Sequence, residues 1–591
     1  MPDITGTMWT FTLIAVAVVL WLIYRKRCFS VFKEMGIPGP EPNLLFGNML
    51  ELVIKTPIKC HEEWFKKYGK IVGYFFGTKP VVLVADVDLL KKIQVSDFHK
   101  FINRPNLFSG RPDRKPGKVP RVEGFSQQMI TLRDKRWKEI RSIITPSFTA
   151  SKMKQMAPIM NSAIDSLVNN VEKKSAVGEE FDIYLMYQGL TMDVIGRTAF
   201  GIQTDAQNNP NDPLLRSSKL LFSGDIRNFL FILAISFRSL NKMWSWLGRL
   251  RLIFINKGTN PIKELIESVK EVIAVRRKSK ENARPDLLQL MIEAEIDDLS
   301  TVTTDDLIAT GDTDNKDKQT KSSSSSKLIR RMTDADILDN SVLFFLAAYE
   351  TTSTALAFTT HFLIYYPEAQ EKIRKEVQQL LEAEGELDYY SVNKLQYLDQ
   401  FLQESLRLYP PVYLFVSREC GEDVDFGGFK LKEGLAVQVP TYHLHRDPEL
   451  WGPDVNEFKP ERFVSRECGE DVDFGGFKLK EGLAVQVPTY HLHRDPELWG
   501  PDVNEFKPER FSPENKAKIH PMAFQAFGAG PRNCVGMRFA YMEAKLALAR
   551  LLSKYKFKPC SKTDKEDLEL KINSAALNPK NGIWTKAIPV Q

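Results

Sequence analysis

The sequence predicts a mainly α-helical protein with small β-sheets, an α+β fold, that carries a transmembrane anchor at its N-terminus. Apolar residues recur at helical spacing along most of the chain, most clearly over Arg284–Glu295, Asp334–Thr360 and Met537–Ser553. Strand-like runs punctuated by Gly and Pro occur only over Lys70–Ala85 and inside a repeated block nearer the C-terminus. The anchor is predicted by Met8–Tyr24, which contains no charged residue.

The composition narrows the class of protein further. Of 591 residues, 43% are hydrophobic and 26% are charged, which excludes a wholly disordered or collagen-like chain. Basic residues exceed acidic residues by only six, so the overall charge does not indicate nucleic-acid binding. Six cysteines are too few for a disulfide framework in a chain of this length, and they fit a reducing compartment.

One block of the sequence is duplicated. Residues 415–462 recur without a single change as residues 463–510. Solenoid repeats occur at least three times and diverge, so this perfect tandem pair fits a recent duplication or an assembly error better. Without one copy, 591 − 48 = 543 residues of distinct sequence remain. We therefore expect one catalytic domain over residues 44–591, although length alone suggests about four domains.

Residues 1–27 are predicted to be the membrane anchor. The uncharged run would form a helix of about 25 Å, close to the thickness of a thin bilayer core. Arg25, Lys26 and Arg27 follow it at once, whereas a cleaved signal peptide has its positive charge before the apolar run. The positive-inside rule then predicts a single-pass protein with a cytosolic catalytic domain.

Three further segments have a distinctive composition. Residues 28–43 are basic and rich in proline, which predicts a stiff extended hinge. Residues 298–330 contain a serine run without apolar periodicity and are expected to form a disordered loop. The segment Arg227–Lys257 interleaves apolar and basic residues, so it is either a second membrane contact or a pair of core-facing helices.

The residues that carry chemistry centre on Cys534. This cysteine lies in the glycine-rich stretch 527–536, directly before a helical run, where helix N-terminal N–H groups stabilise a thiolate. Its glycines let the backbone approach a flat ligand, and Arg532 is placed to meet an anionic group of that ligand. Zinc would need further Cys or His nearby, and a nucleophilic cysteine would need a base such as His520. A thiolate ligand to haem iron fits best.

This stretch resembles the haem-binding signature of the cytochrome P450 family. The signature's residues match Phe527, Gly530, Arg532, Cys534 and Gly536. Three more stretches resemble family motifs and follow in the family's order, namely Trp137–Arg141, Ala347–Thr352 and Glu404–Arg407. The likeness runs from about Pro38 to the C-terminus. Tyr349–Thr352 and Thr145–Thr149 are most similar to the microsomal branch that oxidises steroids and foreign compounds.

The resemblance implies a role for each motif. Cys534 would be the axial ligand of the iron of haem b, and the other haem-binding residues would be Trp137, Arg141, Arg532, Phe527, Gly530 and Gly536. The donors Trp137, Arg141 and Arg532 suit the haem propionates. Glu350 and Thr351 would deliver protons for oxygen activation, and Ala348 stands where glycine is commoner in the family.

The resemblance also implies a buried network that supports the cysteine loop. Glu404 and Arg407 stand at i and i+3 on one helix face, where they can pair. The third member would be the arginine of a Pro-Glu-Arg-Phe stretch, which the duplication supplies twice as Arg462 and Arg510. We favour Arg510 because it lies closer in sequence to Cys534.

The predicted function is that of a membrane-bound haem-thiolate monooxygenase of the endoplasmic reticulum. It would insert one oxygen atom of O₂ into a hydrophobic small molecule such as a steroid, a fatty acid or a xenobiotic. The alternatives are a haem-thiolate isomerase or dehydratase that acts on a peroxide, and a non-functional duplicated pseudo-enzyme. The substrate lining is expected from Phe108–Gln127, Phe229–Ile235, Phe344, Phe345 and Ala348.

The expected partners are NADPH–cytochrome reductase, cytochrome b5 and membrane lipid, without nucleic acid. The chain has no glycine-rich dinucleotide fingerprint after a strand, so electrons from NADPH must come through an external flavoprotein. A basic patch of Arg133, Lys135, Arg136 and Lys138 would offer an acidic electron donor a docking surface, unless it is an ordinary solvated face.

Overall fold

The structure is a computed structural model of the chain. It describes residues 4–105, 123–222, 227–240, 243–244, 246–248, 250–251, 260–278, 286–294, 331–413, 416–420, 423–426, 429–431, 436–438, 479–480, 485–486, 511, 522–573 and 576–590. The expected loop 298–330 lies outside these described residues, as do His520, Arg462 and Arg510.

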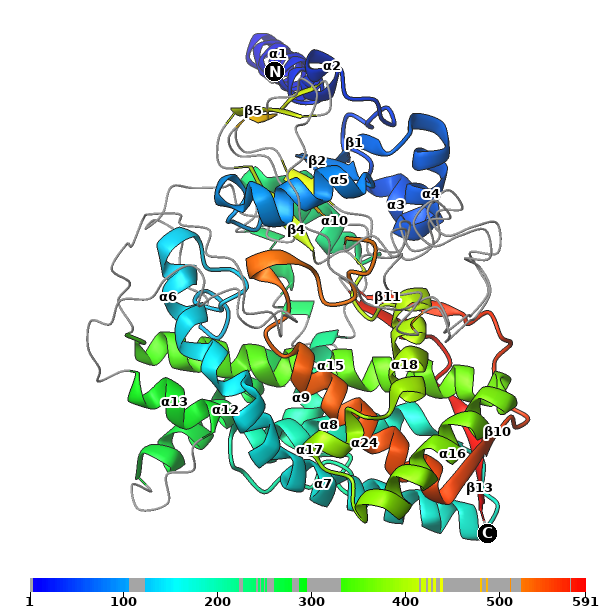
Figure 1. The fold of residues 1–591 in the computed structure, drawn as a ribbon. Coiled ribbons are helices and arrows are strands. Elements are labelled where there is room, and N and C mark those ends of the chain that lie inside the picture. Colours follow the sequence, from blue (N-terminus) through cyan, green and yellow to red (C-terminus); the bar gives the residue numbers. More distant parts are fainter. Residues whose placement is uncertain are drawn as a thin grey trace.

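Helices form most of the described chain, which confirms the predicted fold class (Figure 1). The α-helices are α1 (Ile4–Cys28), α2 (Val31–Met35), α3 (Met49–Lys55), α4 (Pro57–Tyr68), α5 (Val87–Lys91), α6 (Asp134–Ile144), α7 (Ala150–Ala176), α8 (Ile183–Ala199), α9 (Pro213–Phe222), α10 (Phe229–Ser236), α12 (Pro261–Lys278), α13 (Leu287–Glu293), α15 (Asp334–Tyr365), α16 (Pro367–Glu384), α17 (Tyr389–Val392), α18 (Gln396–Leu408) and α24 (Met537–Lys554). Five short helices of other types are the π-helix η1 (Lys92–Ser96) and the 3₁₀ turns η2 (Phe98–Lys100), η3 (Thr145–Phe148), η4 (Arg238–Leu240) and η8 (Gly530–Arg532).

The strands form four small sheets. The largest has the order β1-β2-β7-β4-β9, and the others have the orders β10-β13-β3, β11-β12 and β6-β5-β8. Their bounds are β1 (Ile71–Phe76), β2 (Lys79–Val84), β3 (Phe181–Asp182), β4 (Ser417–Glu419), β5 (Asp423–Phe426), β6 (Phe429–Leu431), β7 (Ala436–Gln438), β8 (Leu479–Lys480), β9 (Val485–Gln486), β10 (Tyr555–Lys558), β11 (Leu570–Asn573), β12 (Ala576–Pro579) and β13 (Trp584–Pro589). The strand-like run predicted over Lys70–Ala85 is confirmed as β1 and β2, but the expectation that strands are confined to two regions is wrong. Strands β10–β13 and β3 were missed; four of the five have no more than four residues, too few to show an alternating pattern.

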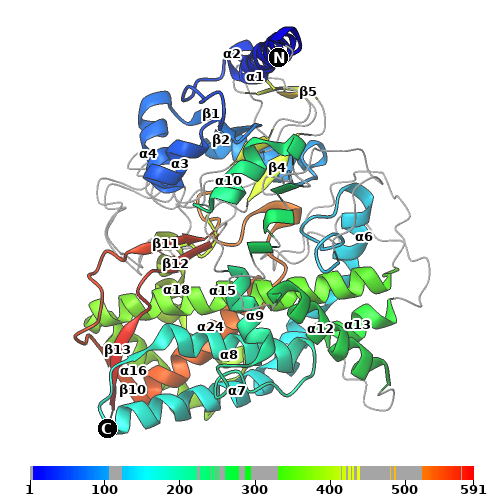
Figure 2. The same cartoon turned by 180° about the vertical axis from the view of Figure 1, so that it is seen from behind.

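The long helix α15 runs through the middle of the helical part of the molecule, among α8, α18 and α24 (Figures 1 and 2). It begins with a capping box, in which Thr333 and Asp336 satisfy each other's backbone N–H groups. It is apolar and long enough to cross a membrane, but 78% of its apolar window is buried inside the protein. Helix α15 is therefore the central core helix.

Helix α1 matches the predicted anchor. It covers the uncharged run and ends in Arg25, Lys26 and Arg27. Its apolar side chains are exposed, in contrast to those of α15, with Phe11 at 72% and Leu13 at 65% of full accessibility. An exposed apolar helix of 25 residues fits a lipid environment.

The hinge that follows the anchor is packed against the protein and is not a free connector. The rings of Phe29 and Phe32 lie 4.8 and 4.9 Å from that of Phe75 in β1. The backbone of Gly73 bonds to the carbonyl of Pro38. Arg25 is buried and donates to the carbonyls of Leu44, Leu45 and Ser236. These contacts attach the end of the anchor to the globular domain.

Both copies of the duplicated block contribute a strand to the same place. Val81 of β2 pairs with Ala436 in the first copy. Its neighbour Val82 pairs with Val485, which is the second copy of Val437. The two identical segments meet β2 in the same register and therefore compete for one strand edge, which can bond to only one neighbour at each residue.

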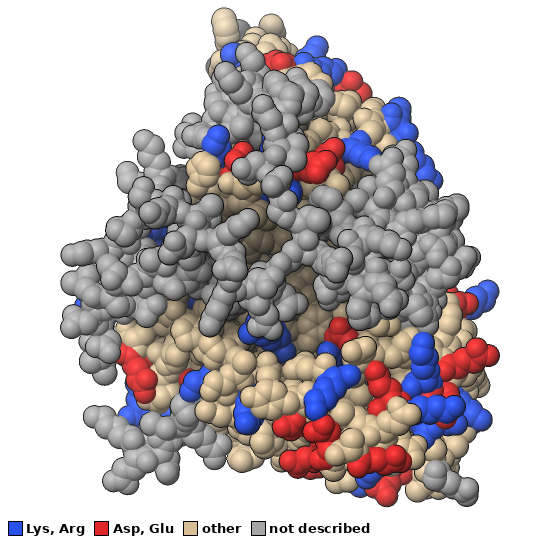
Figure 3. Space-filling model, in the orientation of Figure 1, with Lys and Arg blue, Asp and Glu red and all other residues tan. Residues whose placement is uncertain are grey.

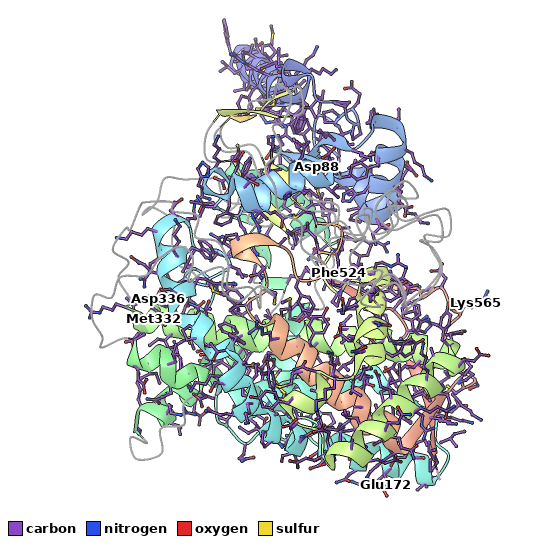
Figure 4. All side chains as sticks on the ribbon, viewed as in Figure 1. Asp88, Glu172, Met332, Asp336, Phe524 and Lys565 are labelled. Carbon is purple, nitrogen blue, oxygen red and sulfur yellow. The ribbon has the colours of Figure 1, made fainter. Side chains whose placement is uncertain are left out.

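Two hydrophobic cores meet near the cysteine loop. One lies among the helices around α15, and the other lies around β1, β2, α4 and the hinge. Phe524 packs against both cores and lies between the two parts of the molecule (Figure 4). The loop that precedes α24 is drawn in orange between them in Figure 1.

Candidate active site

The cysteine loop has a tightly defined backbone. The Cys534 N–H donates to the carbonyl of Phe527 at 2.8 Å, which closes the loop before α24. Gly530 has a φ of +69°, and a Cβ there would stand 1.9 Å from the carbonyl oxygen of Gln94. Glycine at 530 is thus required by both conformation and space. At Gly536 a Cβ would meet only Phe148, at an ordinary 3.8 Å, so packing against the described chain does not require that glycine.

Opposing effects act on the thiol of Cys534. Burial of the sulfur within the protein raises its pKa, whereas a backbone hydrogen bond from Gly536 and the charges of Arg141 and Arg104 lower it. The side chain is nevertheless accessible, so it faces a hollow inside the protein. Figure 3 shows a hollow at the centre of the face that it draws. Burial has the larger effect, so the pKa is raised overall, and the hydrogen bond and the two cations are the features that favour a thiolate.

Four arginines gather around this loop, three of them buried and Arg104 partly buried, and all lie in surroundings that disfavour their charge. Arg141 and Arg532 belong to the predicted site, and Arg104 and Arg418 join them. Burial lowers the pKa of Arg104 and of Arg141 to about 10, and it lowers those of Arg418 and Arg532 well below the usual value. Mutual repulsion adds to the effect of burial. Such a cluster needs anionic partners.

The arginines hold the loop while keeping some N–H groups available. Arg141 donates to the carbonyl and to the side-chain oxygen of Asn533, both at 2.9 Å. Arg532 donates to the carbonyl of Leu132 at 2.8 Å, and its guanidinium lies 4.1 Å from the Trp137 ring. Among the described residues, the buried Nε atoms of Arg141, Arg418 and Arg532 have no hydrogen-bond partner.

These observations test whether the residues fit haem. Two propionates would supply the anionic oxygens that the unpartnered guanidinium N–H groups require. Within the described residues, no group of three His, Cys, Asp or Glu side chains could hold a metal ion directly. An iron that is bound by a porphyrin needs only one such ligand here, and Cys534 is the residue placed to provide it. The residues fit haem.

Helix α15 presents Ala347, Ala348 and Thr351 at a part of its surface that is not buried. The Thr351 hydroxyl donates to the carbonyl of Ala347 at 2.7 Å, one turn earlier. The helix stays α-helical through these residues despite the methyl group of Ala348. Phe345, expected to line the substrate pocket, instead stacks on Phe200 with ring centres 4.1 Å apart and is fully buried, so that expectation is wrong.

Glu350 lies on a different face of α15 from Thr351, and its side chain is buried between α8 and β12. Its Oε1 accepts hydrogen bonds from the Asn578 side-chain amide and, at 3.4 Å, from the Tyr184 hydroxyl. Burial raises the pKa of Glu350. Hydrogen bonds from Asn578 and Tyr184 and the positive charges of Lys219 and Lys571 act in the opposite sense. The carboxyl can therefore hold a proton in a defined orientation.

Glu404 and Arg407 form the expected pair on α18. Both side chains are fully buried, and Arg407 donates through Nε and Nη2 to the two carboxylate oxygens, each at 2.6 Å. A bidentate buried pair fixes both side chains far more firmly than an exposed pair would. The third arginine of the expected network, Arg510 or Arg462, lies outside the described residues.

The expected basic patch on α6 is largely neutralised. Arg133 pairs with Glu419, and Arg136 pairs with Glu139 and Asp336. Figure 3 shows acidic and basic side chains interspersed over the lower, described part of the face that it draws. The patch thus offers an acidic partner less positive charge than its sequence indicates.

Four residues of the site escaped the sequence analysis. Arg104 acts on Cys534, and Arg418 acts on Arg532 of the same loop, from segments that are distant in sequence. Tyr184 and Asn578 reach Glu350 in the same way. Arg104 lies in no motif that marks it. Arg418 has an identical copy, Arg466, so the sequence could not indicate which copy is used.

Comparison with known proteins shows which family the chain resembles over its length. A family model described as Cytochrome P450 matches residues 37–467 and 464–585, and the match divides at the start of the second copy. The chain is 31% identical over 587 residues to "Cytochrome P450 3A1" of Rattus norvegicus, covering 99% of this chain and 97% of the relative. It is 33% identical over 570 residues to "Cytochrome P450 3A5" of Homo sapiens, covering 96% of this chain and 94% of the relative.

Proposed function

Because this chain belongs to the cytochrome P450 family, we propose that it inserts one oxygen atom of O₂ into a hydrophobic small molecule at the endoplasmic reticulum membrane. Membership of the family makes it a haem-containing oxidoreductase and a monooxygenase of the 3A type. The finer part of the proposal concerns the substrate class, the residues and the electron source. Its main support is the convergence of four buried guanidinium groups on the loop of Cys534.

We assign Cys534 as the axial thiolate ligand. Haem bound there would supply the one-electron and oxygen chemistry, which no side chain of the protein can perform. The chain's own contribution is to neutralise and orient the cofactor. Arg104, Arg141, Arg418 and Arg532 would receive the propionates, and Trp137 would hold the guanidinium of Arg532 in place by its 4.1 Å contact.

We assign proton delivery to Glu350 and Thr351. Glu350 is held by two donors on Oε1, so its other oxygen is the one that can exchange a proton. The Thr351 hydroxyl is bonded to Ala347 and can rotate to donate toward the hollow. A general acid of this kind accelerates a reaction by about 10²–10⁴-fold when its pKa is near the working pH. A raised pKa for Glu350 moves that carboxyl toward this range.

Two further observations bear on the substrate and on the electron source. Apolar and aromatic side chains dominate the surroundings of α15, which suits a hydrophobic substrate. The segment Phe229–Ile235, which was expected to line the pocket, forms most of α10. Its Ile232 and Ile235 pack into the core around β1 and β2, and its Phe229 is exposed. We propose that electrons come from NADPH through a separate reductase, because the sequence has no dinucleotide-binding fingerprint.

The ferrous carbon-monoxide spectrum of the purified, haem-supplied protein tests the ligand assignment. The wild type should show the red-shifted Soret band of a thiolate complex, and Cys534→Ala should lose it. An unchanged band in Cys534→Ala would refute the assignment. Thr351→Ala should keep the band but divert NADPH oxidation from product to peroxide, and equal coupling of NADPH use to product would remove Thr351 from the proposal.

A further inference from the structure

Gln94 is a fully buried polar residue that lies directly against the cysteine loop. It occupies the π-helical turn η1, closed by a bond from the Asp97 N–H to the carbonyl of Lys92. Single π-turns often occur at functional sites because they turn a side chain out of the regular helical row. Nothing in the described mechanism uses this turn.

The side-chain amide of Gln94 bridges two points of the loop. Its Nε2 donates to Oε1 of Gln525 at 2.9 Å, and its Oε1 accepts from the Ala529 N–H at 3.2 Å. Gln525 in turn donates to the carbonyl of Met522 at 3.0 Å and accepts the Gly528 N–H at its backbone carbonyl. The bridge therefore fixes residues 522–529, immediately before the Phe527–Cys534 closure.

The backbone of Gln94 acts on the same loop. Its carbonyl oxygen occupies the space beside Gly530 where a side chain would otherwise stand. Gln94 thus contacts the loop at Gln525, Ala529 and Gly530, although more than 430 residues separate them in the sequence. An apolar side chain would fill the same volume at less desolvation cost, so the amide is not explained by packing.

The loop's known supports act on its other side. Arg141 holds Asn533 through two bonds, and Arg104 donates to the carbonyl of Arg532 at 3.3 Å. Gln94, in contrast, contacts Gln525 and Ala529, which precede the turn at Gly530–Arg532. All three supporting residues precede the duplicated block, so the duplication leaves them unchanged.

We propose that Gln94 is a positioning residue for the cysteine ligand, acting through Gln525 and Ala529 to set where the Cys534 sulfur stands. This inference rests on the proposed role of Cys534. Residues that orient a ligand from behind change metal affinity by about 10–100-fold when they are replaced.

The test compares Gln94→Leu with Gln370→Leu. Gln370 is an equally buried glutamine, remote from the loop, that donates to the carbonyls of Leu363 and Phe557 and accepts the Phe557 N–H. Both variants lose buried hydrogen bonds, so both should have a lower thermal midpoint. Only Gln94→Leu should lose thiolate-type Soret intensity in the carbon-monoxide spectrum and release haem to an acceptor protein about 10–100-fold faster.

A milder variant keeps the proposal testable if Gln94→Leu does not fold. Gln525→Met removes the amide–amide bond and leaves the Gln94–Ala529 bond, so an intermediate spectral loss is expected. Wild-type haem release and spectra in Gln94→Leu and Gln525→Met, or equal losses in Gln370→Leu, would overturn the proposal. Failure of the ligand assignment is separate, because it would appear in Cys534→Ala as a retained thiolate band.

Discussion

The two donors to Glu350 give a graded prediction for proton delivery. Asn578→Leu replaces the amide by an apolar side chain of similar size. Asn578 Oδ1 has no hydrogen-bond partner in the described part of the chain, so the substitution removes the bond to Glu350 and leaves no donor to Oδ1 unpaired. The donor favours the ionised carboxylate, and its loss should therefore raise the pKa of Glu350 further.

The structure indicates the size of the effect. A hydrogen bond to a charged group contributes about 1.5–3 kcal/mol, which is a ten- to hundred-fold change in the ratio of protonated to ionised Glu350. The Tyr184 hydroxyl lies 3.4 Å from the same oxygen, at the long limit of a hydrogen bond. Tyr184→Phe should therefore change the ratio by less than about tenfold, in the same direction.

The assay is product formed per NADPH consumed, measured against pH, with the solvent deuterium isotope effect. If protonated Glu350 is the acid, the alkaline limb of the coupling profile moves to higher pH, most in Asn578→Leu and less in Tyr184→Phe. Tyr187→Phe is the matched control, because Tyr187 lies on the same helix but bonds to Thr360 at 2.8 Å. An unmoved limb in Asn578→Leu, or a shift in Tyr187→Phe as large as in Tyr184→Phe, would refute the reasoning.

Three further predictions concern stability. Burial lowers the pKa of His61 to about 3 and that of His361 to about 4, so each folded-state pKa lies below the unfolded value of 6.5. Their contribution to stability is present above pH 6.5 and is lost on acidification, by about 2 kcal/mol per histidine at pH 5. His61→Leu should therefore flatten the pH dependence of the thermal midpoint. The control variant His99→Leu, at an exposed site, should not. Burial raises the pKa of Glu543 well above its usual value, and neither carboxylate oxygen has a hydrogen-bond partner among the residues that the structure describes. Glu543→Met should therefore stabilise the protein at neutral pH by about 1–3 kcal/mol, a gain that shrinks toward pH 4. Deleting residues 463–510 removes β8 and β9 but keeps β7 of the first copy, which pairs with β2 and β4. The carbon-monoxide spectrum and the thermal midpoint should therefore change little, and loss of the thiolate band would show that the site depends on both copies.

The parts of the site that could be predicted lie within single stretches of chain. The Cys534 loop, the α15 motif and the Glu404–Arg407 pair each depend on local spacing, which the sequence displays directly. Arg104, Gln94 and Asn578 belong to the site only because folding brings distant segments together. No local pattern marks such residues. The packing of the hinge could not be predicted for the same reason, because its aromatic side chains pack against a strand whose position the local composition does not reveal.

The same reasoning bears on how the chain accommodates its extra 48 residues. Arg418, near the start of the first copy, lies in the arginine cluster, and Phe511, just after the second copy, packs its ring 5.9 Å from that of Phe524. The surplus therefore lies between two fixed points of one site. Doubling a loop's length adds only about 0.6 kcal/mol of closure entropy, which is small against a domain's stability. Since the described supports of the cysteine loop, Gln94, Arg104 and Arg141, all precede the duplicated block, the duplication can enlarge this connection while leaving the position of Cys534 intact.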